Sequence, residues 1–257
     1  MTQVPAGRLG RVFDLPRSAR LVSWYNAWLS GAATPDDLPD LVLASDTAHS
    51  VVGLDADSHS LMTAAARLRR LGASAATLAL PVPGNLLGLA GPPALNMAAV
   101  EVGEAALFPG SGLALVPEAV GAGVFWHAHP SHPVREVPDV RDAERWLRET
   151  LIAVAQRLTD LDVATWRPEI AGALSVLRDE HEAPLPTGYP VRATRLAALA
   201  LRCQAIVQLA HSTGPAAVTS LELTCRDSAL DDLSAAARTA LVAACSSHPT
   251  LDDARAR

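Results

Sequence analysis

The sequence predicts an α+β fold, in which a small, helix-covered β-sheet domain at the N-terminus is followed by an all-α helical bundle. Short apolar runs separated by Pro, Gly and Ser between residues 75 and 129 are typical of strands. Apolar residues at helical spacing occupy the chain on both sides of this region. With 257 residues, 49% of them hydrophobic and 19% charged, the chain can bury two modest cores. We therefore expect two domains, residues 1–134 and 138–257, divided at Pro130–Pro138.

The first predicted helix buries two tryptophans. Leu21, Trp24, Tyr25 and Trp28 fall on one helical face, which we expect to pack against the sheet. Gly31 stands where a glycine commonly ends a helix. The elements expected next are a helix from Thr34 to about Ala44, a strand at Ser50–Leu54 and a helix at Ser58–Leu71.

Four apolar runs then predict the rest of the sheet: Thr77–Val82, Met97–Leu107, Leu113–Pro117 and Gly123–His129. The uncharged stretch from Leu71 to Val100 is long enough to cross a bilayer, but its prolines and glycines would break a membrane helix several times. We therefore expect this stretch to form part of a buried sheet and its connecting loop.

Helical spacing resumes after Pro138 and continues to the end of the chain. Because the connections are short, the helices are expected to pack as an antiparallel bundle. They are predicted at Trp146–Leu158, Trp166–Leu177, Val191–Ala210, a shorter segment after Gly214-Pro215, and Ser228–Cys245.

Composition excludes several classes of function. All 21 basic residues are Arg, so mechanisms that need a P-loop, Schiff-base or Ser-Lys lysine are ruled out. A net charge of −6 with scattered Arg argues against nucleic-acid binding. The three cysteines, Cys203, Cys225 and Cys245, are too widely spaced for a disulfide framework or a cysteine metal site. We expect them to be small core residues. The N-terminus carries charges without an apolar stretch after them, so we expect a cytoplasmic protein that binds no membrane.

One cluster stands out, at Trp126-His127-Ala128-His129-Pro130-Ser131-His132. If the strand continues through His129, then His127 and His129 project from the same face and could bind one zinc ion, with Asp142 as a third ligand. The alternative is that the run is a surface histidine-proline linker between the domains. We predict that the two imidazoles do not converge with a carboxylate and that the purified protein holds no stoichiometric zinc.

Three stretches, Gly10–Gly31, Leu80–Ala105 and Ala236–Ser246, resemble a set of uncharacterised actinobacterial proteins, a resemblance that implies no activity. Locally, His127-Ala128-His129-Pro130 is similar to the motif of JAMM (MPN-type) metalloproteases. In that family two histidines and an aspartate hold zinc, and an upstream Glu activates the bound water. The resemblance implies that Asp139 or Asp142 would be the zinc-binding aspartate, and that Glu101 or Glu104 would activate the water. This chain differs from the motif at the serine, where Pro138 or Asp139 stands instead.

Three functions are thus left open by the sequence. The first is a non-catalytic protein that binds a macromolecular partner or a second copy of itself. The second is a zinc-dependent hydrolase with a His-x-His-Pro site. The third is a small-molecule sensor with an apolar pocket between the domains. The first is favoured, because lysine chemistry, nucleotide-binding loops and catalytic triads are missing from the sequence.

Overall fold

A computed structural model describes residues 14–134, 136–160, 185–212 and 220–249. Within these residues a mixed sheet has the strand order β2-β1-β6-β5-β4-β3. The pairing of β1 with β6 is parallel and every other pairing is antiparallel. The strands are β1 (His49–Val52), β2 (His59–Ser60), β3 (Thr77–Ala79), β4 (Ala105–Phe108), β5 (Leu113–Val120) and β6 (Gly123–Pro130).

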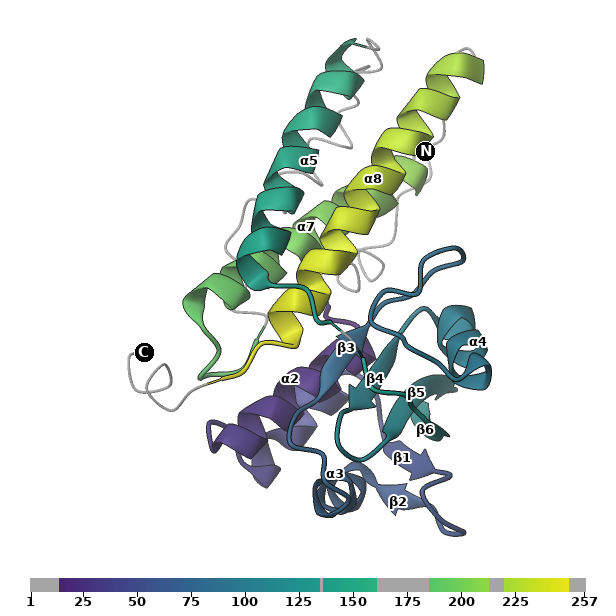
Figure 1. Ribbon diagram of the computed structural model, residues 1–257, viewed down its shortest axis with the longest axis vertical. Helices are drawn as coiled ribbons and strands as arrows, with labels where there is room; N and C mark the ends of the chain where they lie inside the picture. Colours follow the sequence, from purple (N-terminus) through teal and green to yellow (C-terminus); the bar gives the residue numbers. More distant parts are fainter. Residues whose placement is uncertain (1–13, 135, 161–184, 213–219, 250–257) are drawn as a thin grey trace.

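The described helices are α2 (Arg17–Ser30), α3 (Leu61–Arg70), α4 (Pro93–Val102), α5 (Val140–Asp160), α7 (Val191–Ser212) and α8 (Ser220–Cys245). Figure 1 shows α5 and α8 lying side by side and extending away from the sheet, with α7 against α8. Over the described ranges the fold is therefore a mixed α+β fold, with its strands between residues 49 and 130. None of the described helices has an apolar stretch long enough to cross a membrane.

Helix α2 forms as its sequence predicts. It ends at Gly31, whose φ of 78° is the left-handed conformation that favours glycine. Trp24 is fully buried, while Trp28 is only partly buried and packs against the core. The expected burial is therefore complete for Trp24 and partial for Trp28.

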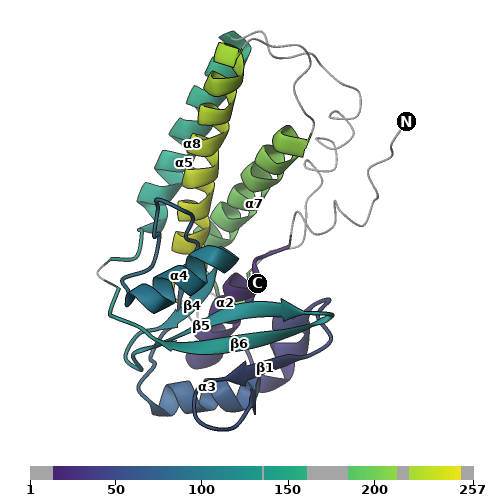
Figure 2. The same ribbon diagram turned by 90° about the vertical axis from the view of Figure 1, so that its right-hand side faces the viewer.

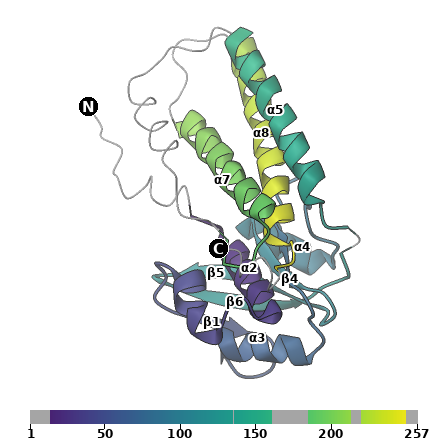
Figure 3. The ribbon, with the colours of Figure 1, turned by 90° about the vertical axis from the view of Figure 1, so that its left-hand side faces the viewer.

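Helices cover the two faces of the sheet unequally. On one face, α2 and α3 bury alternate strand residues such as Leu78, Leu115 and Trp126 in the main core. On the other face, Leu95 and Ala99 of α4 pack on buried residues of β3, β4 and β5, and α4 also contacts β6. Figure 2 shows β1, β5 and β6 with α4 at their side and α2 behind them, and Figure 3 shows α2 from the opposite direction.

Two predicted elements are wrong. The run Met97–Leu107 is not one strand, because helix α4 occupies Pro93–Val102 and only residues 105–108 form β4. Leu95 and Ala99, both fully buried, have the i, i+4 spacing of one helical face, and Gly103 ends the helix with a φ of 86°. The helix expected from Thr34 to Ala44 is instead a 3-10 turn, Pro35–Asp37, followed by a π-helical turn, Pro39–Leu43.

The helical part also differs from its prediction. Helix α8 is continuous from Ser220, whereas the sequence indicated a start at Ser228. The helix predicted at Trp166–Leu177 lies outside the described residues, as does the segment at Gly214-Pro215. Cys203 and Cys245 are buried, as expected, but Cys225 is exposed on α8. Burial raises the pKa of the Cys203 thiol to about 11, so this thiol stays protonated and unreactive at neutral pH.

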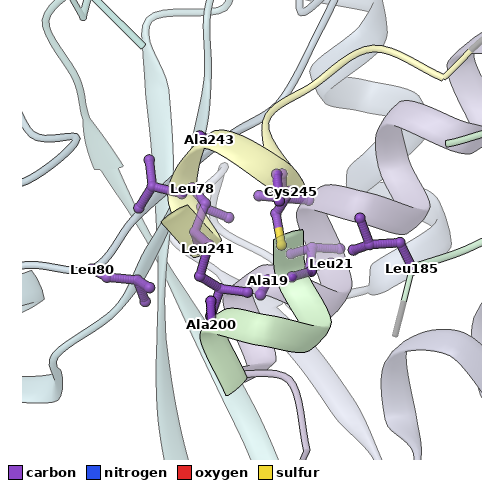
Figure 4. Close-up of a cluster of buried hydrophobic side chains, with 14 of the residues drawn as sticks. Ala19, Leu21, Leu78, Leu80, Leu185, Ala200, Leu241, Ala243 and Cys245 are labelled. Atoms are coloured by element: carbon purple, nitrogen blue, oxygen red, sulfur yellow. The ribbon is translucent and has the colours of Figure 1, made fainter. Parts of the chain in front are cut away.

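The helices do not form a separate bundle, because the main core continues from the sheet into α7 and α8. Figure 4 shows Leu241 and Ala243 of α8 beside Leu78 at the sheet edge, and Cys245 beside Ala19 and Leu21 of α2. The buried face of α8 is rich in alanine, which lets its backbone approach α2 and the sheet closely. One shared core therefore holds the sheet and the C-terminal helices together.

Side chains from the helices close the free edge of β3. The amide of Asn26 accepts a hydrogen bond from Ala76 N at 2.7 Å and donates one to Ala76 O at 2.9 Å. Leu78 N donates to the hydroxyl of Ser246 at 3.0 Å, and Arg238 donates to Leu80 O at 2.9 Å. An open strand edge would leave these buried backbone groups without partners. The contacts at Leu78 and Leu80 also attach the end of α8 to the sheet.

We expect the Ser246→Ala variant to lose about 1–3 kcal/mol of unfolding free energy, because the buried Leu78 N–H is left without an acceptor. The Ser247→Ala variant is the matched control, since its hydroxyl donates only to Ala244 O at the helix end. Urea unfolding followed by circular dichroism measures both. Equal losses in the two variants would contradict the role assigned to Ser246.

Candidate functional site

The histidine-rich run lies in β6 and just after it. Val124 and Trp126 are buried in the main core, so His127 and His129, which alternate with them, face the opposite side of the sheet. The strand extends to Pro130 and therefore includes both imidazoles on one face. His132 follows the strand, and its Nδ1 lies 3.3 Å from Ala90 O.

His127 contacts a carboxylate from the neighbouring strand. Its Nε2 lies 2.7 Å from Oε2 of Glu118, and both side chains are largely open to solvent. An exposed pair of this kind contributes little to stability. Partial burial, and to a smaller extent the charge of His127, lowers the pKa of His129. The sequence did not indicate Glu118 as a site residue, because its place beside His127 depends on the register of β5 against β6.

Asp142 is not among the contacts of these imidazoles in the structure. Asp142 lies in the first turn of α5, where it pairs with Arg145 at 2.6 Å. Asp139 accepts hydrogen bonds from the backbone N–H groups of Arg141 and Asp142, which hold the pKa of its carboxyl below the usual value. Over the described ranges, no three His, Cys, Asp or Glu side chains are placed to share a metal ion.

The two glutamates that the JAMM resemblance would implicate also lie elsewhere. Glu101 is exposed on α4. Glu104 accepts a hydrogen bond from the backbone N–H of Ser18 at 2.6 Å and so caps the N-terminus of α2. Burial raises the pKa of the Glu104 carboxyl, while the Ser18 hydrogen bond and the charges of Arg17 and Arg20 oppose that rise. The capping bond gives Glu104 a structural role.

A second polar cluster lies on the covered face of the sheet. Asp46 accepts two hydrogen bonds from Arg17, at 2.8 and 2.9 Å, and one from Arg20 at 3.1 Å. The Arg17 hydrogen bonds hold the pKa of the Asp46 carboxyl below its usual range. Oδ2 of Asp46 also lies 3.2 Å from Nε2 of His49. The cluster ties the start of α2 to the segment before β1.

His49 is held in one protonation state by its neighbours. Trp126 Nε1 can only donate, and it lies 3.3 Å from Nδ1 of His49, so Nδ1 must accept. The Nε2–H then donates to Asp46, which leaves the ring neutral, and burial lowers the pKa of His49 in agreement. The His49 side chain is 1% exposed, so a substrate cannot reach it. This cluster therefore stabilises the fold, and its imidazole is not accessible for catalysis.

A hollow of about 180 Å³ lies between α2 and the residues after α8. Ligand pockets commonly measure about 300–1,000 Å³ and are mostly apolar. This hollow is smaller, and its walls are mainly polar. Its lining residues are Asn26, Leu29, Ser30, Ser74, His248 and Pro249.

The part of the sheet that α4 leaves uncovered forms what we call the outer face. Phe125 lies near its centre with 40% of its surface exposed. Strand register places Ser50 of β1 on one side of Phe125 and Glu118 of β5 on the other. The outer face consists of Ser50, Val52, Ser60, Glu118, Val120, Phe125, His127 and His129.

The chain is similar to a family of proteins from mycobacteria. Models of the N-terminal and C-terminal domains of the Rv1486c-like protein match residues 18–140 and 141–242. The chain is 30% identical over 237 residues to the uncharacterized protein Rv1486c of Mycobacterium tuberculosis H37Rv, covering 74% of this chain and 81% of that protein. The chain belongs to the Rv1486c-like family. The resemblance to uncharacterised actinobacterial proteins is thereby confirmed.

A second relative, the uncharacterized protein MT1533 of M. tuberculosis CDC 1551, has the same identity and coverage. No solved structure matches the chain. The matched models and relatives give no support to the local resemblance to JAMM metalloproteases. The family description names two domains, and the printed names of these relatives state no activity, so the function of the chain is argued from its surface.

Proposed function

We propose that the protein is non-catalytic and acts by binding a protein partner through the outer face. The observation that carries this proposal is the exposure of Phe125 at the centre of an uncovered half-sheet. In sheets with one solvated face, the outward positions are ordinarily polar. An aromatic ring flanked by a carboxylate and imidazoles is instead the composition of an interface, with an apolar centre and a polar rim.

The alternatives fit the described residues less well. A catalytic zinc needs about three protein ligands and a base, whereas Asp142 pairs with Arg145 and Glu104 caps α2. We therefore propose that His127 and His129 hold no resident metal. A sensor would need a larger and more apolar pocket than the hollow beside Asn26. Nucleic acid is an unsuitable partner for a face that includes Glu118.

Site-specific photo-crosslinking in the native host tests this proposal. A photoreactive phenylalanine analogue replaces Phe125 in one version of the full chain and Trp146 in the control. Trp146 is a matched control because it is 43% exposed, close to the 40% of Phe125, but lies on α5. We expect a discrete protein adduct from position 125 and none from position 146. No adduct at position 125, or the same adducts at both positions, would overturn the proposal.

A further inference from the structure

We infer that the partner of the outer face is a basic protein segment that places an arginine side chain over Phe125, beside Glu118. This inference rests on the proposed function and gives its partner a chemistry. Strand register sets the site, because one row of paired residues runs across β2, β1, β6 and β5. The row consists of Ser60, Ser50, Phe125 and Glu118. Phe125 is 40% exposed and the Glu118 side chain 59%, so an aromatic ring and a carboxylate are neighbours on an open surface.

The fixed charges on α4 and on strands β3 to β6 have one sign. Between residues 71 and 134, all of which the structure describes, the sequence has no Arg or Lys, and its carboxylates are Glu101, Glu104 and Glu118. Glu104 caps α2, which leaves Glu101 and Glu118 as the exposed carboxylates of this stretch. The lowered pKa of His129 keeps its imidazole neutral at neutral pH. This part of the surface therefore attracts a cation.

The arginines of the sheet domain lie with the helices of the opposite face. Among residues 14–70 all of them are on α2 or α3, and they are Arg17, Arg20, Arg67, Arg69 and Arg70. Three of them pair with aspartates, two with Asp46 and one with Asp55. Within the described part of the chain, no ion pair joins Glu118 to an arginine. A partner can therefore supply the cation that Glu118 lacks.

An arginine side chain suits this row better than an apolar one. An apolar side chain on Phe125 would remove water from the Glu118 carboxylate without replacing its hydrogen bonds, which costs free energy. A guanidinium can lie over the Phe125 ring, because the face of an aromatic ring attracts a cation. Its N–H groups can at the same time donate to Oε1 of Glu118, since Oε2 contacts His127. The planar guanidinium thus serves both groups, which the compact ammonium of lysine does less well.

Helix α4 limits the shape of the partner. It buries Val116, which pairs with His127 in the next row along the strands. On the other side of the Phe125 row, Val120 is 49% exposed. The row is thus bordered by a helix on one side and open on the other. This shape favours a narrow segment over a second sheet.

Titration of the isotope-labelled full chain with acetyl-Gly-Arg-Gly-amide, followed by NMR, tests this inference. We expect saturable shifts that centre on the backbone amides of Ser50, Phe125 and Glu118, and far smaller shifts when uncharged citrulline replaces the arginine. Glu118→Gln and Phe125→Leu should each weaken binding about two- to fivefold, the range for one exposed ion pair or cation–π contact. Glu149→Gln removes an exposed carboxylate on α5 and should leave binding unchanged. Circular dichroism confirms that each variant is folded.

Shifts spread over the exposed acids, equal shifts with the citrulline peptide, or unchanged affinity in Glu118→Gln would overturn the inference. Photo-crosslinking from position 125 separates this failure from failure of the proposed function. We expect Glu118→Arg to lower the yield of the protein adduct severalfold, and Glu149→Arg to leave it unchanged. An adduct that keeps its yield in Glu118→Arg would overturn the inference and leave the proposed function standing. No adduct with the native Glu118 would overturn both.

Discussion

Replacing Trp24 with Ala is expected to lower the unfolding free energy by about 3–5 kcal/mol, the cost of removing a large aromatic ring from a packed core. The side chain is fully buried, its ring stacks on Trp28 with centroids 5.6 Å apart, and its Nε1 donates to Thr34 O at 3.3 Å. The substitution therefore removes apolar contacts and leaves a cavity between α2 and the turn that follows it. Urea unfolding monitored by far-UV circular dichroism measures the loss.

The control for this experiment is Trp146→Ala on α5, where the ring is 43% exposed. We expect that variant to lose less than about 1 kcal/mol, because most surface substitutions have small effects. A small loss for Trp24→Ala would show that the ring is accessible, and would make the Trp24–Trp28 stack a candidate binding platform.

The Asp46→Ala variant should lose about 3 kcal/mol at neutral pH. Arg20 and His49 would remain buried without their shared acceptor, and removing one partner of a buried ion pair is strongly destabilising. The pKa of the Asp46 carboxyl is depressed in the folded protein. Its contribution is therefore present above the pKa of the unfolded chain and is lost as the pH falls through the folded pKa.

Unfolding free energies measured from neutral to acidic pH test both parts of this expectation. The difference in unfolding free energy between wild type and the Asp46→Ala variant should become smaller as the pH falls. Asp142→Ala supplies the matched control, because Asp142 is 66% exposed and its pair with Arg145 should be worth under about 0.5 kcal/mol. If this difference in unfolding free energy stays constant down to acidic pH, the role assigned to the Asp46 carboxylate is wrong.

Local patterns in the sequence were enough to predict α2, α3, α5 and α7, most of α8, and the strands β1, β3, β5 and β6. Gly31 and the spacing of the tryptophans defined α2, and the apolar run at Gly123–His129 defined β6. The errors arose where local signals were ambiguous. The segment from Met97 to Leu107 is apolar apart from Glu101 and Glu104. The i, i+4 pair of Leu95 and Ala99 therefore did not distinguish a helix followed by a strand from one long strand.

Contacts distant in sequence could not be predicted in the same way. Asp46 and Arg17 are 29 residues apart, and His49 and Trp126 are 77 apart, so their cluster depends on how the strands pair. The alanine-rich end of α8 has the sequence of a bundle helix, but it packs on the edge of β3. There the hydroxyl of Ser246 accepts a hydrogen bond from Leu78 N. For the candidate site, alternation in β6 indicated that His127 and His129 share a face, while Glu118 and Ser50 joined that face only through register.

Native mass spectrometry of the purified full chain tests the central claim most directly, because one spectrum reports both the number of chains and any bound metal. We expect the purified chain to carry no stoichiometric zinc. A single chain carrying one zinc ion, which disappears when His127 and His129 are both changed to Ala, would contradict this expectation.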